Sequence, residues 1–154
     1  MKYAALIFLA LAACGSSDPL VGTWVDTSLT DAGTAPDVKT YKATLVLNAN
    51  KSMSETVIET NSGTAAVFPG CTVMSTVTGT WSEATSGPTK TVTITTTGGT
   101  HNVRTLCINT VDNNAGSPFA ATDGTSFAFT YTVTGDSLIL TPSNAGLGVQ
   151  FTKQ

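Results

Sequence analysis

The sequence predicts an all-β protein of antiparallel strands, arranged either as a sandwich or as an up-and-down barrel. Apolar and polar residues alternate with a period of two along most of the chain, and threonine is abundant. No window of eleven or more residues beyond position 14 repeats apolar residues at helical spacing. Such alternation is typical of half-buried strands, and β-branched threonine fits a pleated surface. Because no helices alternate with the strands, a parallel α/β sheet is excluded.

The individual strands follow from local alternation between turn residues. In the first half, "YKATLVLN" and "SETVIET" flank the turn "NANK", and "CTVMSTVTGTW" alternates apolar residues with threonine. In the second half, "KTVTITTTGG" alternates in the same way, and "SFAFTYTVTGDSLILT" forms a hairpin around Gly135 and Asp136. We expect eight or nine strands, near residues 20–26, 41–48, 52–60, 72–82, 90–97, 101–108, 126–134, 137–141 and 148–153.

The first residues indicate export. "MKYAALIFLALAAC" has a positive charge at Lys2 and an apolar run from Ala4 to Ala13, which is too short to cross a membrane and is typical of a signal peptide. Its ending, Leu11-Ala12-Ala13-Cys14, resembles the lipobox of bacterial lipoproteins. That resemblance implies cleavage before Cys14 and acylation of this cysteine. The segment "GS" after the cysteine, in place of aspartate, implies the outer membrane.

The expected organisation is therefore a signal peptide at 1–13, a lipidated tether at 14–19 and one β-barrel domain at 20–154. The formal net charge is −3, with one arginine, Arg104, and no basic run. Nucleic acids attract clustered Lys and Arg, so nucleic-acid binding is excluded. The membrane, reached through the lipid anchor, is the expected partner.

The chain contains "GTW" twice, at Gly22–Trp24 and Gly79–Trp81. The first copy follows Leu20, the hairpin "YTVTGDSL" comes late, and "FTK" ends at Lys153. This pattern resembles that of bacterial lipocalin-like lipoproteins and implies a lipocalin-like barrel. It also implies roles at the closed end: Gly22 bends the chain into the first strand, Trp24 closes the barrel, and Lys153 stacks on Trp24 as a cation–π contact. We expect Trp81 to be mainly structural, with a ligand-lining role as the alternative.

The residues provide little material for catalysis. A hydrolytic triad needs a histidine beside a nucleophile, and the single histidine, His101, lies at an expected strand entry. Glu55 and Glu59 fall on one strand face with Val57 between them, and we expect both to point to solvent. We therefore expect a protein without enzymatic activity, metal or cofactor.

Two functions remain. The first is a lipid-anchored binding protein that holds a small apolar ligand inside the barrel. Its expected lining comprises Tyr41, Leu45, Val73, Val77, Trp81, Phe127, Phe129 and Tyr131, with Val133, Leu138 and Leu140 on the same face. The alternative is a structural or interaction protein with a packed barrel, whose loops contact a protein or glycan. An internal cavity favours the first, and a solid interior with exposed aromatic residues around Phe68 or Phe119 favours the second.

Two cysteines, Cys71 and Cys107, remain besides Cys14. An even pair in an oxidising compartment usually forms a disulfide, which would stabilise the fold by about 3–4 kcal/mol in the chain-entropy model. A metal site with His101 is the rival interpretation, although the spacing of these residues suits it poorly. We predict that thiol labelling of the folded, unreduced protein leaves both cysteines unmodified. Modification of both would contradict the disulfide.

Overall fold

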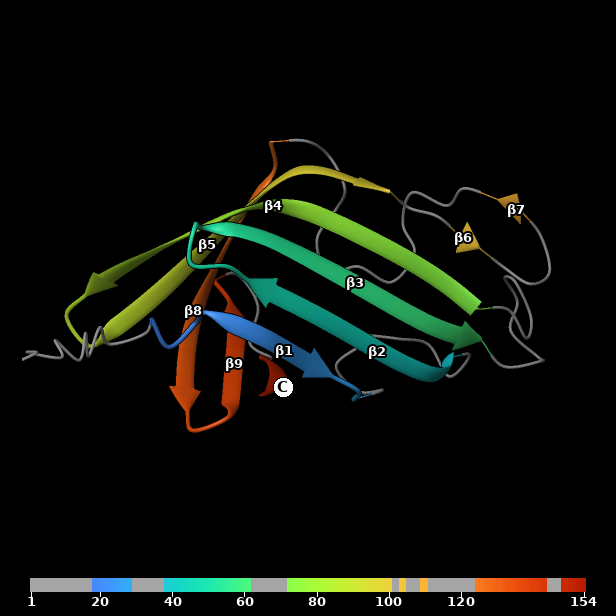
Figure 1. Cartoon of the computed structure of the whole chain (residues 1–154). Coiled ribbons are helices and arrows are strands. Elements are labelled where there is room, and N and C mark those ends of the chain that lie inside the picture. Colours follow the sequence, from blue (N-terminus) through green and yellow to red (C-terminus); the bar gives the residue numbers. More distant parts are fainter. Residues whose placement is uncertain are drawn as a thin grey trace, which may run out of the picture.

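Eight antiparallel strands close on themselves to form a barrel (Figure 1). The computed structural model describes residues 18–28, 38–61, 72–100, 103–104, 109–110, 124–143 and 148–154. The barrel strands are β1 (Gly22–Asp26), β2 (Val38–Leu47), β3 (Ser52–Asn61), β4 (Thr72–Ser86), β5 (Thr89–Thr100), β8 (Ser126–Thr134), β9 (Ser137–Pro142) and β10 (Val149–Lys153).

Barrel strands that follow one another along the chain pair with one another, and β1 pairs with β10 to close the ring. The predicted up-and-down barrel is therefore confirmed, and the sandwich alternative is wrong. Closure leaves no barrel strand edge without a partner strand. The ring and its hydrophobic core lie within residues 18–154, so this part of the chain contains the interactions it needs to fold.

Two expected strands differ from the structure. Of the strand expected near 101–108, the described part is β6 (Val103–Arg104), which pairs with β7 (Asn109–Thr110) in a separate two-stranded sheet. In the barrel, β5 pairs directly with β8. Strand β4 continues to Ser86, beyond the expected end at 82, although residues 82–86 are exposed. Pairing with β5 continues as far as Ser86 and Thr89 and so lengthens β4. A prediction based on the alternation of buried and exposed residues does not detect such pairing.

The two ends of the barrel differ. Turns at 48–51, 87–88 and 135–136 join strands at one end, which we call the closed end (Figure 1). Gly87 and Gly135 each come first in a two-residue turn, with φ of 59° and 57°, as a type II′ hairpin turn requires. The strand ends that lead into the longer connections β1–β2, β3–β4, β5–β8 and β9–β10 lie at the other, open end.

The interior consists of the inward-facing residues of successive strands. Seventeen buried apolar residues form one cluster that includes Leu20, Trp24, Leu45, Val77 and Phe151. The strand register places Trp24, Leu45, Glu55 and Val77 in one layer across β1 to β4. We call the interior from this layer to the closed end the closed half, and the interior beyond it the open half.

The two GTW glycines are required for different reasons. Gly22 has a φ of +151°, which other residues rarely adopt, and a Cβ there would lie 2.8 Å from Cε of Lys153. Gly79 lies where β5 bulges, between the pairs Thr78–Gly98 and Gly79–Thr96. A Cβ on Gly79 would collide with the main-chain oxygen of Thr95.

We predict that Gly79→Ala lowers the free energy of unfolding by about 1–3 kcal/mol, because the obstacle is main chain that cannot move without disturbing the bulge. Urea denaturation of the two proteins measures the difference. Gly98→Ala is the matched control, since a Cβ there meets only Oγ1 of Thr78 at an ordinary 3.5 Å. Equal destabilisation by the two substitutions would contradict the interpretation.

Candidate ligand-binding site

Trp24 lies inside the barrel near its closed end. Its side chain is fully buried, and its indole Nε1 donates a hydrogen bond of 2.8 Å to the carbonyl oxygen of Leu20. Lys153 lies opposite Trp24 in the β1–β10 register, with Nζ 5.1 Å from the centroid of the indole ring. The structure thus brings Gly22, Trp24 and Lys153 together at the closed end.

The second tryptophan has an equivalent environment. Trp81 is buried, its indole Nε1 donates to the carbonyl oxygen of Asn48 at 3.1 Å, and Nζ of Lys51 lies 3.5 Å from its ring centroid. Lys51 adopts a left-handed φ of 65° at the end of the β2–β3 turn. Sequence analysis did not identify Lys51. The second GTW segment could have indicated it. A lysine was expected to stack on Trp24 of the first GTW segment, so a second lysine could have been expected on Trp81.

Lys51 also ties residues before β1 to the barrel. Its Nζ lies 2.7 Å from Oδ2 of Asp18 and 3.3 Å from Oε1 of Glu83, and the Tyr131 hydroxyl donates to Oε2 of Glu83 at 2.8 Å. Burial acts to raise the pKa of Asp18, but hydrogen bonds outweigh it and lower the pKa. Burial and the Glu83 hydrogen bond raise the pKa of Tyr131 to about 12. Because Lys51 is well exposed, the pairs contribute at most about 1 kcal/mol each, and their role is to position Asp18.

Most of the expected ligand-lining residues belong to the packed core. Tyr41, Leu45, Val77, Trp81, Phe129 and Tyr131 are buried members of the hydrophobic cluster, as are Leu138 and Leu140. Phe127 and Val133 are partly buried against it. The side chain of Val73 is outside the described residues. Leu45, Val77 and Trp81 lie in the closed half, whereas Tyr41 lies beyond the Leu45 layer, in the open half.

Glu55 and Glu59 were expected to face solvent, and this prediction is wrong. Glu55 is 1% exposed and Glu59 is 7% exposed, on the same face as buried Met53 and Val57. The outward face of β3 carries Ile58, which is 39% exposed. The assignment to solvent relied on charge alone, whereas the register pairs Glu55 with buried Leu45 and Val77.

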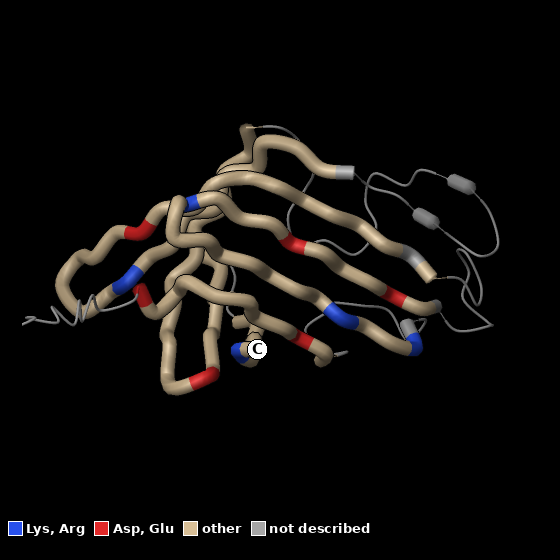
Figure 2. The backbone as a smooth tube through the Cα atoms, viewed as in Figure 1, with Lys and Arg blue, Asp and Glu red and all other residues tan. Residues whose placement is uncertain are grey.

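The open half combines buried polar and acidic groups with the apolar side chains of Tyr41, Ala43 and Val57. Asp26, Glu59 and Ser75 lie buried on three different strands, and Tyr41 is the direct neighbour of Glu59 across β2 and β3. Among the described residues, the buried charged side chains are Asp26, Glu55 and Glu59, all acids. Figure 2 shows how acidic and basic residues are distributed along the backbone of the barrel. Sequence analysis missed Asp26 and Ser75.

Two of these buried groups have no hydrogen-bond partner within the described chain: Oε1 of Glu59 and Oγ of Ser75. A buried polar atom left without a partner costs about 1–3 kcal/mol. Burial also raises the pKa of the Glu59 carboxyl. A ligand with a hydrogen-bond donor would supply what these atoms lack.

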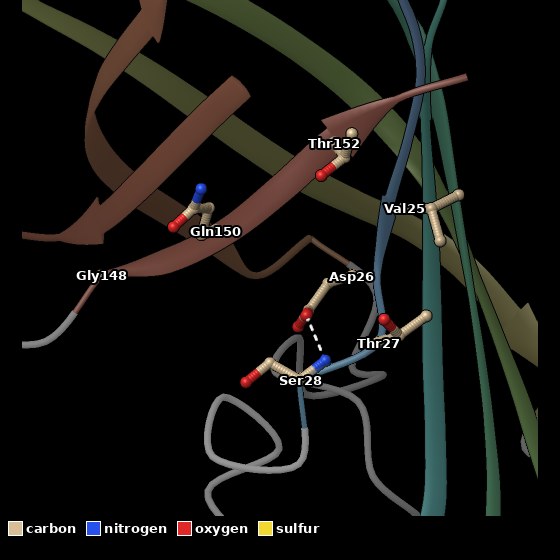
Figure 3. A pocket seen from close by; sticks show the side chains of 7 residues that line it. All are labelled: Val25, Asp26, Thr27, Ser28, Gly148, Gln150 and Thr152. Atoms are coloured by element: carbon tan, nitrogen blue, oxygen red, sulfur yellow. Dashed lines mark hydrogen bonds between the residues drawn. The ribbon is translucent and has the colours of Figure 1, made fainter. Parts of the chain in front are cut away.

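A pocket opens beside this region where β1 and β10 separate (Figure 3). These strands share two residue pairs, Trp24–Lys153 and Val25–Thr152, and the pocket begins where this pairing ends. It has a volume of about 410 Å³ and is lined by Val25, Asp26, Thr27, Ser28, Gly148, Gln150 and Thr152. Oδ1 of Asp26 accepts a 2.7 Å hydrogen bond from the backbone N–H of Ser28, which orients the carboxylate at the pocket.

Other expected features lie outside the described residues: Cys14, Cys71, Cys107, His101, Phe68 and Phe119. Within the described part of the chain, no three His, Cys, Asp or Glu residues are grouped as a metal site would need. The described residues also contain no helix long and apolar enough to span a bilayer. Comparison with protein-family models, curated proteins and solved structures found no match to this chain.

The raised pKa of Glu59 predicts a pH dependence of stability. The ordinary value is 4.5, so above this pH the unfolded chain loses a proton that folded Glu59 still holds. The contribution of Glu59 to stability is therefore fully present below about pH 4.5 and is lost as pH rises through the folded pKa. We predict that Glu59→Gln removes this loss, so the variant gains stability relative to the parent as pH rises.

Urea denaturation at intervals from about pH 4 to pH 8 measures this difference. Asp136→Asn is the matched control, because it removes the same charge from an exposed turn at the closed end. It should follow the parent profile. If the Glu59→Gln profile also runs parallel to the parent, the prediction is wrong.

Proposed function

We propose that this chain is a lipid-anchored protein of the bacterial cell envelope that binds a small ligand in the open half of its barrel. The supporting observation is the division of the interior. Apolar residues fill the closed half, while the open half contains buried Glu59 and Ser75 atoms without partners in the described chain. Unpartnered polar groups of this kind suit the binding of a ligand, and we propose no enzymatic activity.

The proposed ligand position differs from the one expected from the sequence. Residues such as Leu45 and Trp81 are core, and the ligand would instead contact Tyr41, Ala43 and Val57 through its apolar part. Its polar part would meet Glu59 and Ser75. The pocket between β1 and β10 supports access from the side, because Asp26, a buried acid of the same region, is one of the residues that line it.

The lipobox supports anchoring through Cys14, and the contacts of Asp18 support an orientation. Four residues span at most about 15 Å between Cys14 and Asp18. Asp18 is bonded to Lys51 in the β2–β3 turn, at the closed end. With an acyl anchor at Cys14, the closed end would lie nearest the membrane and the open end would face away from it. The absence of aspartate after Cys14 supports the outer membrane as the location.

The alternative remains a packed barrel that acts through its loops, and the filled closed half is the observation that favours it. Ile58 and Ile139 are the large apolar side chains exposed on the described surface. They lie on β3 and β9, which are not neighbours in the barrel, and isolated exposed apolar residues are ordinary. The described surface therefore adds no docking patch in support of this alternative.

Native mass spectrometry tests the ligand proposal. Residues 15–154 are purified from a bacterial periplasm and incubated with a bacterial envelope extract. We expect a discrete adduct on the parent protein. It should be absent from Ser75→Leu, which fills the open half at a residue that is 1% exposed. Ser54→Leu, on the outer side of β3, is the matched control and should retain the adduct.

Circular dichroism establishes that both variants are folded. If the parent carries no adduct, or if Ser75→Leu carries the same adduct as the parent, binding in the open half is contradicted. The packed-barrel alternative then becomes the better account.

A further inference from the structure

The charge inside the barrel points to the chemistry of the ligand. Asp26, Glu55 and Glu59 are each at least nine-tenths buried, and every buried charged side chain in the described chain is an acid. The described lysines lie at the surface or, for Lys51 and Lys153, over tryptophan rings at the closed end. Burying like charges is costly unless a positive charge accompanies them.

Glu59 is the acid on which the choice of ligand chemistry depends. It is 7% exposed, its Oε1 has no hydrogen-bond partner in the described chain, and neither does Oγ of nearby Ser75, which is 1% exposed. The two residues face inward from neighbouring strands, with Val57 opposite Ser75 in the register and Glu59 two residues further along β3. An acceptor and a hydroxyl thus face the same space.

The neighbour of Glu59 on the other side is aromatic. Tyr41 pairs directly with Glu59 between β2 and β3, and its side chain is also buried. Directly paired residues have Cβ atoms about 5 Å apart, so the ring and the carboxyl group border one space. A carboxylate beside an aromatic ring suits an organic ammonium group, because the cation gains an ion pair and a cation–π contact together.

We propose that the ligand of the open half is a small organic cation, an amine with an apolar body, and that Glu59 is its counter-charge. The inference rests on the proposed function, since it names the ligand class of the same site. Ala43 and Val57 offer apolar contact to the body of such a molecule. Metal ions fit less well, because the described acids are not grouped in threes. An anion in the open half would instead meet the buried carboxyl group of Glu59.

The test uses three probes with the same ten-carbon chain: decylamine, decanol and decanoate. Isothermal titration calorimetry at neutral pH measures their affinities for residues 15–154, with each probe below its micelle concentration. We expect decylamine to bind at least about tenfold more tightly than decanol, and decanoate to bind most weakly. In Glu59→Gln the affinity for decylamine should fall to that for decanol, while the affinity for decanol stays unchanged. Asp136→Asn should retain the preference for the amine.

The outcomes separate the two proposals. If decylamine and decanol bind the parent equally, or if Glu59→Gln keeps the preference for the amine, the inference is overturned while ligand binding itself stands. If none of the three probes binds the parent, the inference is overturned and the proposed function loses its support as well. A Glu59→Gln protein that binds decanol as the parent does is shown by that result to be folded.

Discussion

The pairing of β1 with β10 is the constraint on which the rest of the structure depends. It consists of two residue pairs, yet it converts a meander with two free edges into a closed ring. The same pairing places Lys153 opposite Trp24, so the contact that closes the ring also covers the closed end. Because the pairing stops at Val25, the strands separate beyond it and leave the pocket beside Asp26.

The two GTW segments form similar arrangements at two places on the ring. At each, an indole lies buried inside the barrel, its N–H donates to a main-chain oxygen, and a lysine covers its face. A buried tryptophan requires a partner for its N–H, and a main-chain oxygen at the closed end supplies one in both cases. The two glycines are needed for different reasons. Gly22 adopts a positive φ, whereas Gly79 leaves room for the main chain of β5.

Strand alternation and turn chemistry are local, and they were sufficient to predict antiparallel strands, while the choice of a barrel over a sandwich came from the lipocalin-like resemblance. Gly135 before Asp136 predicted a tight hairpin, and the alternation in "YKATLVLN" predicted the buried face of β2 correctly. The acidic interior was not predictable in this way. Whether Glu59 faces inward depends on the register of β3 between β2 and β4, a non-local property, and charge suggested the opposite face. The pocket likewise depends on where β1 and β10 separate, beyond the pair Val25–Thr152, whose members are 127 positions apart in the chain.

The apolar packing of the closed half explains how a barrel with unpartnered buried polar groups can fold. The closed half contains Leu20, Trp24, Leu45 and Val77, each fully buried, and a fully buried apolar side chain contributes about 1.5–3 kcal/mol. Against this, a few buried polar atoms without partners cost about 1–3 kcal/mol each. The apolar closed half can offset that cost as long as the unpaired groups remain few. The unpartnered Glu59 and Ser75 atoms lie beyond the Trp24 layer, so the packing around Trp24 is left undisturbed.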